Sequence, residues 1–97
     1  MLIRNAVVNG LRTDLRLMHG RVQEMGVGLL KGLYESEINL DGDELRCCTS
    51  AQQLPLRFRR RAAVQPPGTH IACGTPSPLL RWREGKLIGV IDEHAAD

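Results

Sequence analysis

The chain has 97 residues, of which 42% are hydrophobic and 25% charged, and its formal net charge is +2. This length fits one small domain and excludes a (β/α)₈ barrel, which typically needs about 250 residues. The charge is too small to predict a nucleic-acid-binding face. No apolar run approaches the roughly 18 residues of a membrane span, and no signal peptide is recognisable. We therefore expect a cytoplasmic protein without a membrane partner.

The first half of the chain predicts short strands separated by glycine turns. An apolar segment over residues 2–8 ends at Asn9-Gly10, a dipeptide that tolerates the positive φ of tight turns. Residues 13–18 then alternate leucines with Asp14 and Arg16, the pattern of a half-buried strand with one polar face.

A hairpin is expected next, around His19-Gly20. A two-residue turn there pairs Leu17 with Val22 and makes residues 22–25 the returning strand. Three glycines between positions 26 and 32 favour a loop over a helix for residues 29–34. After this loop, apolar and polar residues alternate again over residues 37–41, which predicts another strand, and a further turn follows at Asp41-Gly42.

These segments together resemble the start of metal-dependent amidohydrolases of the dihydroorotase, imidazolonepropionase and cytosine deaminase type. The resemblance covers residues 1–45 and rests on LIRNAVV, TDLRL, HGRVQEMG and INLDG in that order. It implies part of a small composite β-sandwich, which in that family is completed after a metal-binding barrel. The family's His-x-His ligand pair occurs nowhere in this chain. The resemblance therefore implies no catalytic residue here.

The middle of the chain is richer in arginine and proline. Residues 54–64 carry apolar side chains at even positions, interrupted by Arg60, and Arg57, Arg59 and Arg61 at odd ones, which predicts a strand with an arginine face. Guanidinium groups pair well with phosphate, so an anion-binding or nucleic-acid-binding strand is one hypothesis. A charged sheet edge that prevents aggregation explains the same residues and is favoured, so a nucleic-acid partner is not expected.

Closing strands are expected after the Pro-Pro-Gly segment. Residues 69–73 predict a short strand, and residues 79–83 and 86–91 predict a hairpin around Glu84-Gly85. That turn places Trp82 opposite Leu87, a favourable cross-strand pair.

The fold class predicted from these elements is all-β, a small β-sandwich or compact barrel of about seven to eight short strands. We expect one domain over residues 1–97. Its parts are amidohydrolase-like strands over 1–45, an atypical middle over 46–68 and closing strands over 69–97.

One cluster of soft metal ligands stands out, comprising Cys47, Cys48, His70 and Cys73. Such residues can hold zinc when four of them converge tetrahedrally. Adjacent cysteines on a strand point to opposite faces, however, so we favour packed, reduced thiols and no cofactor.

The leading functional prediction is a non-catalytic β module that associates with itself or with a larger protein through exposed strands. Two alternatives stay open. One is a small anion- or nucleic-acid-binding protein that uses the strand around Arg57, Arg59 and Arg61. The other is a metal-dependent hydrolase of C–N bonds with an unrecognised site.

Overall fold

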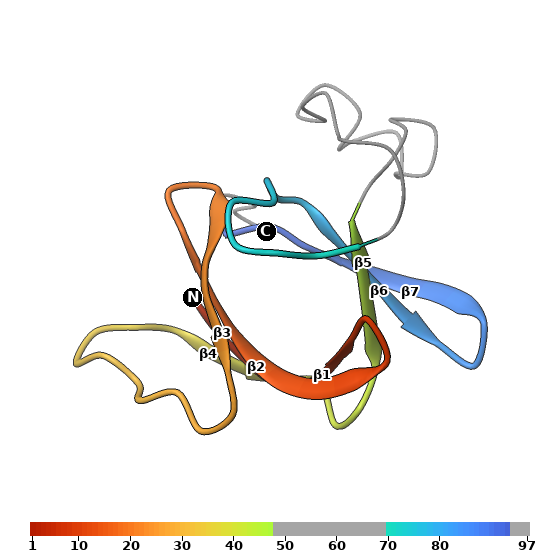
Figure 1. Cartoon of the computed structure of the whole chain (residues 1–97), viewed down its shortest axis with the longest axis horizontal. Helices are drawn as coiled ribbons and strands as arrows, with labels where there is room; N and C mark the ends of the chain where they lie inside the picture. Colours follow the sequence, from red (N-terminus) through yellow and green to blue (C-terminus); the bar gives the residue numbers. More distant parts are fainter. Residues whose placement is uncertain (48–69, 94–97) are drawn as a thin grey trace.

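A computed structural model describes residues 1–47 and 70–93 of the chain (Figure 1). All regular elements in these ranges are β-strands, which confirms the predicted all-β class. The seven strands are β1 (Leu2–Val8), β2 (Leu11–Met18), β3 (Arg21–Gly26), β4 (Glu37–Asn39), β5 (Glu44–Cys47), β6 (Leu79–Arg83) and β7 (Lys86–Ile91). The described part contains no helix that could cross a membrane.

The strands form one mixed sheet in the order β3-β2-β1-β5-β6-β7. Strand β1 pairs in parallel with β4 along its first residues and with β5 near its end, whereas the other neighbours are antiparallel. The sheet curves until β3 meets the segment that precedes β6 (Figure 1). There Val22 N donates to Thr75 O at 2.9 Å and Ser77 N donates to Gly20 O at 2.7 Å. These bonds close the sheet into a small, incomplete barrel.

Four X-Gly turns set the hairpins and the β4–β5 connection. Both residues of each turn have positive φ: Asn9-Gly10 (53° and 81°), His19-Gly20 (57° and 75°), Asp41-Gly42 (51° and 93°) and Glu84-Gly85 (50° and 76°). Turns with two positive φ values match the right-handed twist of the flanking strands, and glycine adopts such values without strain. The predicted pairs Leu17–Val22 and Trp82–Leu87 are both confirmed.

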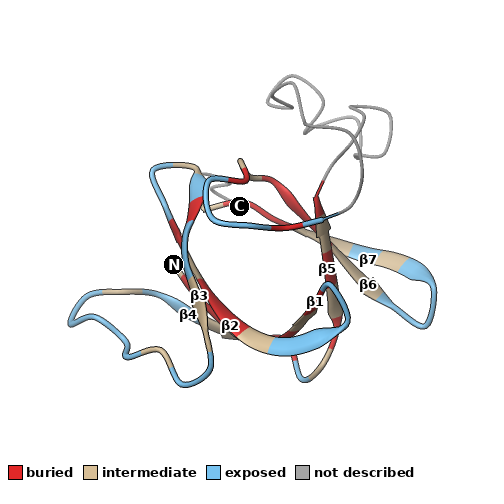
Figure 2. Cartoon of the chain, in the orientation of Figure 1, coloured by how far each residue is buried: buried red, intermediate tan, exposed pale blue. Residues whose placement is uncertain are grey.

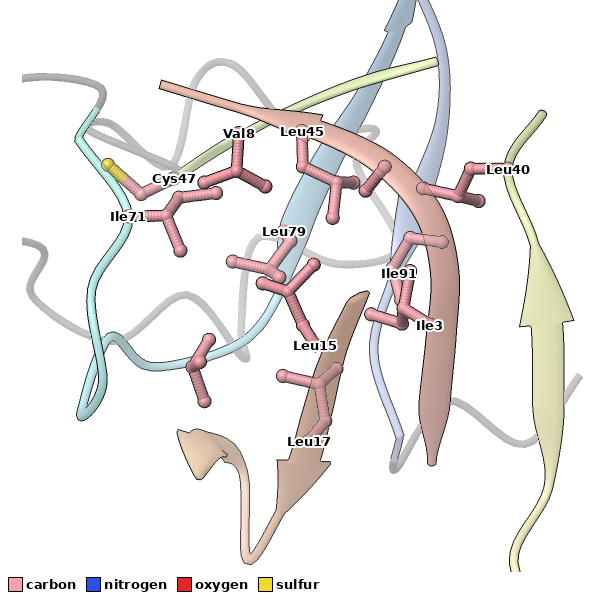
Figure 3. Packing of buried hydrophobic residues seen from close by; sticks show 12 residues of the cluster. Ile3, Val8, Leu15, Leu17, Leu40, Leu45, Cys47, Ile71, Leu79 and Ile91 are labelled. Carbon is pink, nitrogen blue, oxygen red and sulfur yellow. The ribbon is translucent and has the colours of Figure 1, made fainter. Parts of the chain in front are cut away.

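The inner surface of the curved sheet holds the hydrophobic core (Figure 3). Its buried side chains come from six strands and from the connecting segments: Ile3, Ala6, Val8, Leu15, Leu17, Val22, Leu40, Leu45, Cys47, Ile71, Leu79 and Ile91. The buried positions run along the inside of the barrel, while the connecting loops are mostly exposed (Figure 2). Aliphatic residues thus supply the burial that stabilises a chain with so few aromatic ones.

The predicted strand over residues 69–73 is wrong for its described residues, since His70–Cys73 has no strand pairing. The side chain of Asn9 binds both backbone groups of Ile71 instead: Nδ2 donates to Ile71 O at 2.9 Å, and Oδ1 accepts from Ile71 N at 3.1 Å. This clamp holds Ile71 in the core without a neighbouring strand. The strand predicted over residues 54–64 lies outside the described residues.

Truncation of a core leucine on β6 tests this packing. Leu79 is fully buried, so we expect Leu79→Ala to lower the free energy of unfolding by about 2–5 kcal/mol through lost contacts and a cavity. Urea denaturation measures the change. The control is Leu11→Ala, because Leu11 is 72% exposed, and its effect should stay within about 0.5 kcal/mol. Equal losses of unfolding free energy in the two variants would contradict the burial of Leu79 in the core of the barrel.

Candidate functional site

The four predicted zinc ligands differ in their surroundings. Cys47 lies in the hydrophobic core (Figure 3), whereas His70 and Cys73 are exposed in the segment before β6. Cys48 lies outside the described residues. Within residues 1–47 and 70–93, no three or more His, Cys, Asp or Glu side chains are arranged to hold a metal ion. With Cys48 outside the described residues, the favoured prediction of packed, reduced thiols and the zinc alternative both stay untested.

The arginine strand is the other site predicted from the sequence. Arg57, Arg59 and Arg61 all lie outside the described residues. The favoured prediction of a charged sheet edge and the anion-binding alternative therefore both stay untested.

The most distinctive surface feature lies in the connection between β3 and β4, residues 27–36, whose first part, residues 27–34, we call the apolar loop. Four of the seven large hydrophobic side chains that are exposed in the described ranges belong to it: Val27 (88% exposed), Leu30 (86%), Leu33 (86%) and Tyr34 (95%). The connection between β3 and β4 projects away from the barrel and is exposed along most of its length (Figures 1 and 2). These side chains therefore add little to the core of their own domain.

The first part of the apolar loop is anchored by Asp14 of β2. Its Oδ2 accepts from Gly28 N at 3.0 Å, from Leu29 N at 3.2 Å and from Arg4 Nη1 at 3.1 Å, and its Oδ1 accepts from Asn5 N at 3.1 Å. Burial raises the pKa of Asp14, but these hydrogen bonds outweigh it and hold the pKa below its ordinary value of 3.8. One carboxylate thus ties the apolar loop to β1 and β2.

A bulge in β1 makes this anchor possible. The antiparallel register between β1 and β2 shifts between Ile3 and Ala6, and Asn5 within this shift has a φ of 55°. A bulge leaves backbone groups outside the regular ladder. The free N–H of Asn5 can then be satisfied by the carboxylate of Asp14, which is only 6% exposed.

The rest of the apolar loop is anchored by Arg16 and Glu35. Arg16 Nε donates to Glu35 Oε2 at 2.8 Å and Arg16 Nη2 donates to Oε1 at 3.2 Å, a bidentate pair. The same guanidinium contacts the carbonyl of Leu30 and the carboxylate of Glu24, and Gly32 N donates to Glu35 Oε1 at 3.0 Å. The hydrogen bonds from Arg16 and then Gly32 lower the pKa of Glu35 to about 2.

The anchors keep the backbone of the apolar loop in one arrangement while its large side chains face water. A loop that is already ordered loses less conformational entropy when it binds than a disordered one. The geometry therefore suits contact with another surface. The sequence predicts a loop here but not a contact surface. The sequence feature that could have indicated this surface is the run of apolar residues between glycines, GVGLLKGLY.

A second feature is a pocket of about 310 Å³ beside the β6–β7 hairpin. It is lined by Val7, Gly42, Asp43, Glu44, Trp82, Arg83, Glu84 and Gly85. This volume lies at the lower end of the range of about 300–1,000 Å³ for small-molecule sites. The guanidinium carbon of Arg46 lies 4.7 Å from the centroid of the Trp82 ring, and the buried Nε1 of Trp82 has no hydrogen-bond partner among the described residues.

The charged groups of this pocket mainly connect the strands that form it. Asp43 accepts from Arg81 Nε at 2.6 Å and from Arg83 Nε and Nη2 at 2.8 and 2.9 Å. The hydrogen bonds from Arg83, together with those from Arg81, lower the pKa of Asp43 to about 2 despite the opposing effect of burial. Within β5, Glu44 accepts from Arg46 Nε at 2.6 Å. The pocket is therefore a weaker functional candidate than the apolar loop.

Comparison of the chain with family models, curated proteins and solved structures finds no match. The amidohydrolase relationship suggested by residues 1–45 accordingly stays a prediction. Among the described residues, the apolar loop has the geometry that most clearly indicates a function.

Proposed function

We propose that this chain is a non-catalytic β module that binds another molecular surface through the apolar loop. The observation that carries the proposal is a loop held by Asp14 and by the Arg16–Glu35 pair, with four large hydrophobic side chains 86–95% exposed. Burial of such side chains is worth about 1.5–3 kcal/mol each. A partner that covers them gains this energy, and the anchors reduce the entropy lost on binding.

The sequence predicts contact through exposed strands. The proposal instead places the contact surface on the loop between β3 and β4. It retains the suggested relationship to the composite domain of amidohydrolases, which is supported by the motifs of residues 1–45. It describes the module as non-catalytic because the sequence lacks the His-x-His metal ligands of that family. Binding is thus the function that the exposed loop supports best.

Site-specific photo-crosslinking tests whether the apolar loop contacts another molecule, protein or lipid. We expect the full chain with p-benzoylphenylalanine in place of Leu33 to form a discrete adduct when the cells that naturally make it are illuminated. The matched control carries the same photo-reactive residue in place of Leu11, which is also well exposed but lies at the start of β2. If position 33 gives no more adduct than position 11, the proposed function is wrong.

A further inference from the structure

We infer that the surface contacted by the apolar loop is an anionic lipid surface. This inference rests on the proposed function, because it names the partner of the same loop. It also differs from the sequence expectation of no membrane partner, which came from the lack of a spanning segment. Contact at a membrane surface needs only a few inserted side chains and no spanning segment.

The first argument is the small apolar area that the loop presents. An aliphatic side chain contributes roughly 60–120 Å², as its transfer energy implies, and Tyr34 contributes at most about 250 Å². The four exposed side chains together therefore stay below the roughly 800 Å² that each partner buries in a stable protein complex. A second copy of the chain, joined through this loop alone, would be held by too little surface. A lipid layer needs no extended matching surface, because it accepts each side chain separately.

The second argument is the chemistry of the apolar loop. Tyr34 combines an apolar ring with a hydroxyl group, and such residues are enriched at the boundary between lipid and water. Lys31, exposed between Leu30 and Leu33, is the only charged residue within 27–34. A lysine can lay its alkyl stem along apolar surface and place its ammonium group among anionic headgroups.

The third argument is the neutralisation of the acidic groups at the base of the loop. Asp14 and Glu37 share Arg4, at 3.1 and 3.0 Å, while Glu24 and Glu35 share Arg16, and the N-terminal amino group lies 3.8 Å from Glu35. Four carboxylates thus face three cations, so the base of the loop has a formal charge of about −1, and its paired groups repel an anionic surface only weakly at close range. Lys31 brings the formal charge of this region to zero and places a positive charge on the loop itself.

Vesicle flotation tests the inference with the full chain. We expect the protein to float with vesicles of phosphatidylcholine and phosphatidylglycerol, and more weakly with phosphatidylcholine alone. Replacing two loop leucines, Leu30→Asp and Leu33→Asp together, should weaken binding at least about tenfold. Lys31→Glu should remove the preference for the anionic vesicles.

The control variant is Leu11→Asp, which adds an acidic group at an exposed leucine outside the apolar loop. It should bind vesicles within about twofold of the unaltered protein. No flotation of the unaltered protein, or an equal loss in Leu11→Asp, would overturn the lipid inference. The proposed function has a different test, because it is wrong only if position 33 gives no photo-adduct beyond that of the control. A protein adduct there without flotation would retain the proposed function and reject the lipid surface.

Discussion

Asp14→Asn is expected to lower the free energy of unfolding by about 3 kcal/mol, the scale for breaking a buried, hydrogen-bonded charge. The carboxylate accepts from Arg4 and from the three backbone amides of Asn5, Gly28 and Leu29. An asparagine of the same shape presents one acceptor and one NH₂ donor to these four donors. If the NH₂ takes the place of Oδ1, the Asn5 amide loses its acceptor, and if it takes the place of Oδ2, Gly28, Leu29 and Arg4 lose theirs. In both cases the negative charge that holds Arg4 is lost, which weakens the first anchor of the apolar loop.

Two measurements report this change. Urea denaturation gives the loss of stability, and limited trypsin digestion reports release of the apolar loop through faster cleavage after Lys31. The control is Glu37→Gln, which removes the other carboxylate bound to Arg4. The side chain of Glu37 is 40% exposed, so its loss should leave the urea midpoint nearly unchanged. If the two variants behave alike, Asp14 does not anchor the loop as described.

Acid is expected to destabilise the barrel over a pH range that is set by the pKa values of two carboxylates, Glu35 and Asp43. The pKa of Glu35 falls from 4.5 to about 2 and that of Asp43 falls from 3.8 to about 2 in the folded protein. A lowered folded pKa stabilises the protein at pH values above the ordinary pKa, because the unfolded chain binds the proton more tightly. That stabilisation should therefore begin to fall near pH 4.5 and be lost as the pH passes through about 2. The lowered pKa of Asp14 acts in the same direction.

Urea midpoints measured across this pH window test the assignment. Asp43→Asn and Glu35→Gln, combined in one variant, should lower the midpoint near neutral pH and flatten its dependence on pH. Asp41→Asn is the matched control, since Asp41 is an exposed neighbour of Asp43 in the same turn, and it should leave the slope unchanged. A combined variant that keeps the full pH dependence would show that other groups cause the acid sensitivity.

The candidate site was only partly predictable from the sequence. Glycines at positions 26, 28 and 32 indicate a loop, and the structure has one there. That Leu30, Leu33 and Tyr34 stay in water could not be predicted, because hydrophobicity alone does not say which apolar residues find space in a core. The structure also buries Cys47 in the core and leaves His70 and Cys73 exposed, because strand β5 turns Cys47 inward.

The sequence by itself determined the hairpins and their register. The X-Gly dipeptides fix the turns because they adopt positive φ locally, and period-2 alternation then assigns Leu15 and Leu17 to the inner face. Only the tertiary structure decided the parallel pairing of β1 with β4 and β5, and the closure of β3 against residues 74–77. It also decided the burial of Asp14, which the alternation places on a polar face. These features depend on contacts between distant segments, and no local backbone preference encodes them.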